Sequence, residues 1–209
     1  MKIEFDILKK NEFKEAVAIA SRAYEDYEYF TNYFPDAKEC RKAVWNVLYW
    51  AWKTVFGKTN YVTAKIDGKM AAVAQLDNPN FTRPSVFKYL IHGWLCVYFG
   101  VSIRRMNAWV ALDYAASKPC YDYKKSGDGI WYCCSLTVDP AYQGKGVGTA
   151  LIEFMEQYAR ERGGKQLTLF TNSEKNLAFY KKRGFEVFDE REFVYEGHKL
   201  GSWSVKKTL

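Results

Sequence analysis

The sequence predicts an α/β protein with a mixed sheet and one helical insertion. Stretches that alternate at period two and stretches with helical spacing follow one another along the chain, and no repeat or low-complexity linker separates them. Because 209 residues suffice for one substantial core, we expect residues 1–209 to form a single domain. Aromatic residues are abundant at 18%, which indicates an aromatic core, a large pocket or a partner surface.

The N-terminal part begins with a strand pattern and continues with two helix patterns. Residues 2–8 alternate at period two, and residues 12–27 have helical spacing. A second helix is predicted from Asp36, a candidate N-cap, to residue 56. This helix becomes apolar on nearly every face towards its end, so we expect it to be enclosed on more than one side.

A hairpin and a helical insertion follow. Residues 60–79 contain two β-rich runs joined by Asp67-Gly68, a pair that accepts the positive φ angles of a tight turn. Residues 78–126 are helical and irregular, with apolar segments near 84–99 and 104–117. The most apolar run, residues 86–101, is too short and too polar for a membrane span, and we interpret it as a buried or lid helix.

The C-terminal part returns to strands. Residues 128–140 are apolar on both faces, as in a central strand, and Pro140 ends the run. The later elements are predicted as an amphipathic helix from Val147 to Tyr158 ended by Gly163-Gly164, a strand at 165–171, a short helix at 173–184 capped by Ser173 and ended by Gly184, and a hairpin at 185–208 turning at Glu196-Gly197.

Charge and cysteine content exclude several classes of function. Lys and Arg outnumber Asp and Glu by 31 to 24, but no basic block of five occurs, so we expect no nucleic-acid partner. Five cysteines and two histidines lack the spacing of a disulfide framework or a zinc site, so we expect no metal. The N-terminus is unlike a signal peptide, so we expect a cytoplasmic protein without a membrane partner. We also expect a monomer or a homodimer.

A glycine-rich stretch joins the central strand to the amphipathic helix. Gly144, Gly146 and Gly148 lack the Cβ atoms that would keep a ligand away from the backbone. The unpaired amides and the positive dipole end of the helix then favour an anion, most plausibly a phosphate. Gln143 and Lys145 add donors. From spacing alone, a turn that binds nothing remains an alternative.

Two other phosphate motifs are excluded. No Gly-Lys pair is followed by Ser or Thr, as the P-loop pattern requires. The dinucleotide pattern GxGxxG would need glycine at position 149, which is Thr149, and would follow its strand directly.

Residues 136–155, LTVDPAYQGKGVGTALIEFM, resemble the acetyl-CoA-binding motif of the GNAT superfamily of N-acetyltransferases, whose signature [QR]xxGx[GA] is met by Gln143, Gly146 and Gly148. Residues 169–190 resemble the second motif of that family, with Asn176, Tyr180 and then Gly-Phe. The resemblance is close over residues 129–190 and is nearest to the branch that includes puromycin N-acetyltransferase. It implies a central, mostly antiparallel mixed sheet flanked by helices, with residues 78–126 inserted before the central strand.

The resemblance also implies acetyl-CoA as the co-substrate and assigns roles to the residues of both motifs. Loop amides would hold the pyrophosphate, the backbone of the central strand would pair with the pantetheine arm, and Asn176 would bond the pantetheine amides. Tyr180 would be the catalytic acid that protonates the departing thiolate. The complete expected cofactor-binding set is Leu136, Thr137, Val138, Gln143, Gly144, Lys145, Gly146, Val147, Gly148, Thr149, Asn176 and Tyr180.

The resemblance leaves the general base open. Asp77, Asp122 and Asp128 are the carboxylate candidates, and water is the alternative. A covalent route through Cys133 or Cys134 is disfavoured, because no histidine lies near them in the sequence.

We expect the acceptor to be a primary amine of a small molecule that attacks acetyl-CoA directly in a ternary complex. The aromatic residues of the helix at 44–56 and of the insertion at 84–117 are candidates for the pocket walls, with Trp50, Trp52, Tyr89 and Trp94 as the selected positions. Two alternatives remain at this point: acetylation of a protein N-terminus or lysine, and a non-catalytic domain that senses acyl-CoA.

Overall fold

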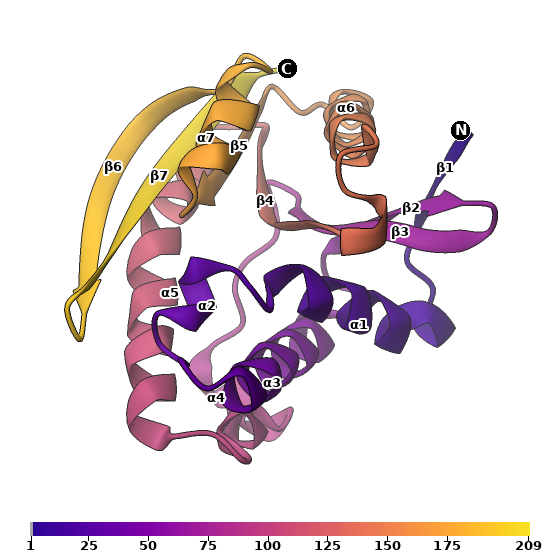
Figure 1. Ribbon diagram of the computed structural model, residues 1–209. Coiled ribbons are helices and arrows are strands. Elements are labelled where there is room, and N and C mark those ends of the chain that lie inside the picture. Colours follow the sequence, from indigo (N-terminus) through magenta and orange to yellow (C-terminus); the bar gives the residue numbers. More distant parts are fainter. Residues whose placement is uncertain (1) are drawn as a thin grey trace.

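A computed structural model describes residues 2–209 and contains a seven-stranded sheet in the order β1-β2-β3-β4-β5-β7-β6 (Figure 1). The neighbouring strands β4 and β5 are parallel, and the other neighbouring pairs are antiparallel. The strands are β1 (Ile3–Ile7), β2 (Asn60–Ile66), β3 (Lys69–Asp77), β4 (Ile130–Val138), β5 (Gln166–Thr171), β6 (Glu186–Tyr195) and β7 (His198–Thr208).

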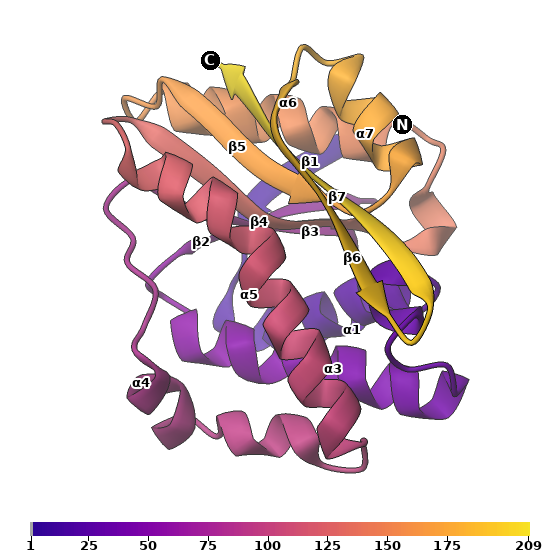
Figure 2. The same ribbon diagram turned by 90° about the vertical axis from the view of Figure 1, so that its left-hand side faces the viewer.

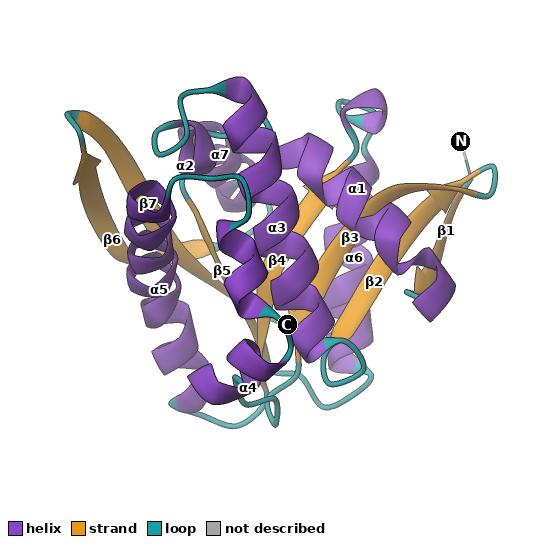
Figure 3. Cartoon of the chain, turned by 90° about the horizontal axis from the view of Figure 1, so that it is seen from below, coloured by secondary structure: helices purple, strands orange, loops and turns teal. Residues whose placement is uncertain are grey.

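Helices cover both faces of this sheet. They are α1 (Phe13–Tyr24), α2 (Glu28–Thr31), α3 (Ala37–Val55), α4 (Val86–Ile91), α5 (Ile103–Lys125), α6 (Val147–Arg160) and α7 (Glu174–Lys181), with 3₁₀ turns η1 (Lys10–Glu12), η2 (Trp94–Tyr98) and η3 (Pro140–Tyr142). The view from below places α1 and α3 in front of the sheet and α6 behind it (Figure 3). The long helix α5 runs obliquely past β4 and β5 beside the β6–β7 hairpin (Figure 2).

Two hydrophobic cores follow from the alternation of strand residues. On β3, Val73 packs in the core formed with α1 and α3, whereas Ala72 and Ala74 pack in the core formed with α6. All three side chains are fully buried. The sheet therefore has an apolar contact on each face, which explains why its central strands carry apolar residues on both faces.

The predicted fold class is confirmed, and several local signals hold. Asp36 caps α3 by accepting a hydrogen bond from the Glu39 amide at 2.8 Å. Asp67 and Gly68 turn the hairpin with φ angles of 49° and 74°. Ser173 caps α7 by accepting from the Asn176 amide. No helix within residues 2–209 combines the length and the apolar character needed to cross a membrane.

The insertion differs from its prediction. Residues 86–101 contain the short helix α4 and the turn η2, interrupted at Gly93 with φ 95°, rather than one helix. Many of their apolar side chains are exposed, and the exposed fraction reaches 75% at Val86 and 83% at Phe99. Of the two alternatives, a buried or a lid helix, the buried helix is therefore wrong, because apolar composition alone does not specify which neighbours cover a segment.

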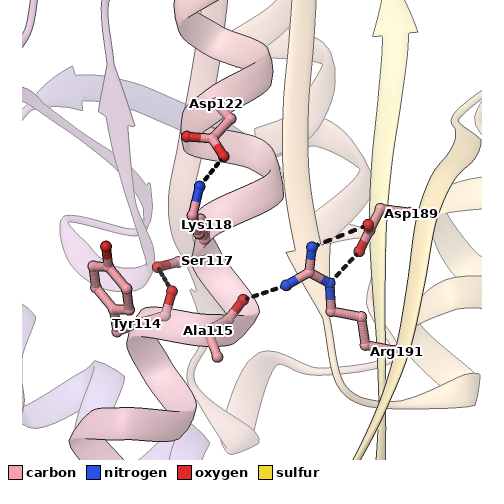
Figure 4. Close-up of polar contacts among 7 residues, drawn as sticks. All are labelled: Tyr114, Ala115, Ser117, Lys118, Asp122, Asp189 and Arg191. Carbon is pink, nitrogen blue, oxygen red and sulfur yellow. Dashed lines mark hydrogen bonds and ion pairs between the residues drawn. The ribbon is translucent and has the colours of Figure 1, made fainter.

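The second helix of the insertion is longer than predicted and continues to Lys125 through Pro119. Proline has no N–H to donate to the carbonyl four residues earlier, which here is the carbonyl of Ala115. Arg191 of β6 supplies the missing donor, with its Nη1 3.3 Å from that oxygen (Figure 4). Asp189 binds the same guanidinium through both carboxylate oxygens, so the β6–β7 hairpin holds α5 in place.

Candidate active site

The central strands β4 and β5 separate and leave a gap on the side of β4 that faces β5. β4 and β5 pair at Ile130, Trp131 and Tyr132 and not beyond, although β4 continues to Val138. Cys134 is the extra residue of a β-bulge, because β3 residue Gln75 pairs with Ser135 and the next β3 residue pairs with Cys133. From the bulge onward, the backbone of β4 has a strand partner only on its β3 side.

The glycine loop lies at the end of this gap. Gly144 and Gly146 have φ angles of 74° and 81°, and nothing lies within 4 Å of a Cβ built at either position. Gly146 is the N-cap of α6 and provides no side-chain acceptor for the amides of the first turn. The Gln143 side chain donates to the Val138 carbonyl at 3.1 Å and fastens the loop to β4. The loop therefore presents free amides to open space.

The second motif closes the other side of the gap. Asn176 and Tyr180 lie one turn apart on α7, and both line the cavity beside β4. The Tyr180 side chain is 8% exposed, and burial raises its pKa well above the usual value for a phenol. Arg183, which stacks on Phe179 with 3.5 Å from guanidinium carbon to ring centroid, also bonds the Thr149 hydroxyl and so joins α7 to α6.

One cavity of about 980 Å³ connects the glycine loop, the gap and an aromatic chamber. The chamber lies between α1, α2, α3, the insertion and β4. Its aromatic walls are Tyr24, Tyr27, Tyr29, Phe30, Trp52, Phe81, Tyr89, Trp94, Trp109, Tyr114, Tyr121, Tyr132 and Phe170. An apolar enclosure of this size suits a small organic molecule.

Three charged side chains line the chamber. Asp113 of α5 accepts a hydrogen bond from the Tyr29 hydroxyl at 2.8 Å, and burial raises its pKa. Asp77, at the end of β3, has no exposed surface and accepts from Thr59, Gln75 and Cys134 in the wall. Burial also raises the pKa of Asp77, although those three hydrogen bonds oppose the shift. The third charged group is Arg83.

A model of the acetyltransferase (GNAT) family matches residues 22–185 of this chain. The chain belongs to this family. The family assignment confirms the resemblance seen in the two sequence motifs, and with it the expected class of protein, the acetyltransferases.

Two curated relatives are similar to about a third of this chain. The uncharacterized protein YxbD of Bacillus subtilis (strain 168) is 42% identical over 64 residues, which are 30% of this chain and 39% of YxbD. The glucosamine 6-phosphate N-acetyltransferase of Trypanosoma brucei brucei is 33% identical over 69 residues, which are 33% of this chain and 46% of the relative. The chain thus matches less than half of the length of either relative.

A solved N-acetyltransferase structure extends the likeness of fold to the whole chain. The PaiA N-acetyltransferase of Thermoplasma acidophilum, whose crystal structure is a complex with coenzyme A, has a TM-score of 0.59 and 11% identity. The superposition covers 100% of both chains. At this identity the match establishes the fold and not the substrate.

Most of the residues predicted to bind the cofactor or the acceptor line one cavity of this GNAT protein. Those that line it are Leu136, Thr137, Val138, Gln143, Gly144, Gly146, Val147, Gly148, Thr149, Asn176, Tyr180, Trp52, Tyr89 and Trp94. Trp50 does not, because it is two residues from Trp52 and so projects about 200° around α3. Its ring lies under the Lys53 ammonium, 4.4 Å away, beside Trp45 and Tyr49. Lys145 folds back from the cavity, and its Nζ donates to the Ala141 carbonyl at 2.9 Å.

The remaining candidate bases and nucleophiles differ in their position relative to the cavity and in their protonation. Asp122 is exposed and pairs with Lys118 along α5, away from the cavity (Figure 4), and Asp128 is also exposed. Burial raises the pKa of Cys133 to about 12 and that of Cys134 well above its usual value, so both remain thiols at neutral pH. No histidine is among the residues that line the cavity.

Sequence reasoning missed Arg83, Asp113, Tyr29 and Lys175, all of which line the cavity. For Asp113 a usable signal exists, because Trp109, Asp113 and Ser117 are spaced at i, i+4 and i+8 and therefore share one helix face. Arg83 lies in a loop, where no periodicity indicates the direction of a side chain.

Replacing Gly146 with alanine is expected to weaken acetyl-CoA binding about five- to tenfold, because an L-residue at φ 81° costs roughly 1 kcal/mol and its methyl group enters the loop. Isothermal titration calorimetry measures the effect directly. Gly197→Ala is the matched control, since Gly197 has φ 87° and equal space but lies at the β6–β7 turn outside the cavity. Equal affinity in G146A and wild type would contradict a ligand role for the loop.

Proposed function

We propose that this protein is an N-acetyltransferase that transfers the acetyl group of acetyl-CoA to the primary amine of a small molecule. The observation that carries the proposal is the continuity of the cavity, in which the glycine loop, Tyr180 and the aromatic chamber share one space. A donor held at the loop and an acceptor held in the chamber would meet beside β4. Such enclosure supplies the proximity that acyl transfer requires.

The donor would bind through the backbone. Free amides from Gly144 to Thr149, at the N-terminus of α6, suit the pyrophosphate. The unpaired edge of β4 from Leu136 to Val138 suits the pantetheine amides, as though the arm were an added strand. Asn176 offers both a donor and an acceptor to the same arm.

Transfer would occur by direct attack. The ammonium of the acceptor gives one proton to the Asp113 carboxylate, directly or through one water, and the free amine nitrogen attacks the thioester carbon. The C–N bond forms, a β4 amide stabilises the oxyanion, and the C–S bond breaks as the nitrogen loses its second proton. The departing sulfur takes a proton from the Tyr180 hydroxyl, and the phenolate regains the proton that the nitrogen has released.

Asp113 suits the role of base better than Asp77. The Asp113 side chain is partly exposed in the cavity and has one hydrogen-bond donor, Tyr29. Asp77 is fully buried, and its oxygens accept from three wall residues. A raised pKa also brings Asp113 closer to the operating pH of a base.

A panel of small primary amines and short peptides, assayed with acetyl-CoA for thiol release and acetylated product, tests the proposal. We expect products from small amines, because Tyr89 and Trp94 of the insertion wall the acceptor side of the cavity. Acetylation of peptides alone would overturn the choice of a small acceptor. Binding of acetyl-CoA without transfer to any amine or peptide would overturn the enzymatic function.

A further inference from the structure

The inference rests on the proposed function and concerns Arg83, which lies in the loop between β3 and α4 and lines the chamber. Its Nη2 donates to the Ser117 hydroxyl at 3.0 Å, and its guanidinium carbon stands 4.0 Å from the centroid of the Tyr121 ring. Ser117 in turn donates to the Tyr114 carbonyl at 3.4 Å (Figure 4). These contacts fix the plane of the guanidinium.

Most N–H donors of the Arg83 guanidinium have no hydrogen-bond partner within residues 2–209. It is charged at every physiological pH and carries five N–H groups, of which one makes a hydrogen bond recorded within residues 2–209. No carboxylate of the described chain forms an ion pair with it. A half-buried charge of this kind is costly unless an anion or hydrogen-bond acceptors meet it. The Tyr121 ring covers one face of the guanidinium plane, so the N–H groups at the edge of that plane remain available for bidentate binding.

The accessible opposite charge in the chamber is Asp113, since Asp77 is fully buried and bonded to wall residues. Asp113 lies one helical turn before Ser117, the residue that Arg83 contacts, yet no ion pair joins Asp113 to Arg83 in the structure. The chamber therefore offers one carboxylate and one guanidinium that are near in the fold but not paired with each other. A molecule with an ammonium and an anionic group complements both.

We propose that the acceptor amine also carries a carboxylate, and that Arg83 binds this carboxylate while Asp113 receives the ammonium. One guanidinium balances one carboxylate. A phosphate dianion would bring a second negative charge into a chamber that already contains two aspartates, so a carboxylate fits better. The aromatic walls suit an apolar body between or beside the two charged groups.

Matched amine pairs test the proposal. The probes are phenylalanine with 2-phenylethylamine and tryptophan with tryptamine, and the readout is the ratio of kcat/KM with and without the carboxylate. We expect wild type to favour the carboxylate-bearing member, and Arg83→Gln to reduce that ratio about 10- to 100-fold, because a charge-assisted bidentate contact is lost. Arg83→Lys should restore part of the ratio. Lys88→Gln removes an exposed cation outside the cavity and should leave the ratio unchanged.

The results of this experiment distinguish the inference about Arg83 from the proposed function on which it rests. A wild-type ratio near one, or R83Q and R83K ratios equal to that of wild type, would overturn the role of Arg83 while transfer to amines stands. An Arg83-dependent preference for a phosphate-bearing amine over its carboxylate counterpart would overturn the choice of carboxylate. Absence of transfer to every amine would overturn both proposals. Acetyl-CoA affinity of each variant, measured separately, identifies any that fail to fold.

Discussion

Replacing Tyr180 with phenylalanine is expected to lower kcat about a hundredfold while acetyl-CoA affinity stays within about twofold of wild type. The phenol is buried beside the β4 gap, and its raised pKa keeps it protonated at neutral pH. Such a phenol is a weaker acid than a free thiol, so the hydrogen bond to the developing thiolate supplies much of the effect. Steady-state kinetics and calorimetric titration with acetyl-CoA give the two quantities.

A second tyrosine provides the control for this change. Tyr158 of α6 lies outside the cavity, and its hydroxyl donates to Asn60 at 3.1 Å. Tyr158→Phe removes the same atom and should leave kcat within about twofold, since it affects only a surface-side contact. A wild-type kcat in Y180F would show that Tyr180 has no part in the chemical step.

Replacing Asp113 with asparagine is expected to lower kcat/KM by roughly 10²- to 10³-fold and to remove the acid limb of the pH profile. The base must be ionised, so wild-type kcat/KM should fall as pH falls through the pKa of Asp113. Burial raises that pKa, and the loss should therefore begin at a higher pH than an exposed aspartate would give. Asp77→Asn should retain the acid limb, because Asp77 lies within the wall.

Stability gives an independent check on the Asp113 variant. A raised pKa in the folded state means that folding favours the protonated carboxyl, so its contribution to stability is present at low pH and is lost as pH rises through that pKa. Asparagine removes this penalty and keeps an acceptor for the Tyr29 hydroxyl. D113N should therefore unfold at neutral pH no more readily than wild type. An unchanged acid limb in D113N, together with its loss in D77N, would assign the base to Asp77.

The donor half of the site was predictable because its parts are consecutive or one turn apart. The loop from Gln143 to Thr149 joins a strand to a helix, and the role proposed for it depends on backbone amides rather than on distant partners. The spacing of Asn176 and Tyr180 likewise fixes a common helix face without knowledge of the tertiary structure. Local sequence therefore determined the geometry of this half.

The acceptor half depends on packing between distant segments. Tyr29, Arg83 and Asp113 come from a helix, a loop and another helix, and no local pattern relates their positions. Composition left an aromatic core, a large pocket and a partner surface as alternatives, and it could not distinguish Trp52 in the cavity from Trp50 outside it without the helical phase of α3. The exposed apolar residues of α4 and η2 show the same limit, since hydrophobicity does not identify neighbours.

Initial rates of coenzyme A release, measured while acetyl-CoA and an accepted amine are both varied, test the central claim most directly. If both substrates occupy the one cavity and the amine attacks the thioester itself, the double-reciprocal plots intersect, and mass spectrometry of enzyme with acetyl-CoA alone detects no acetyl-enzyme. Parallel plots together with an acetylated Cys133 or Cys134 would contradict direct transfer.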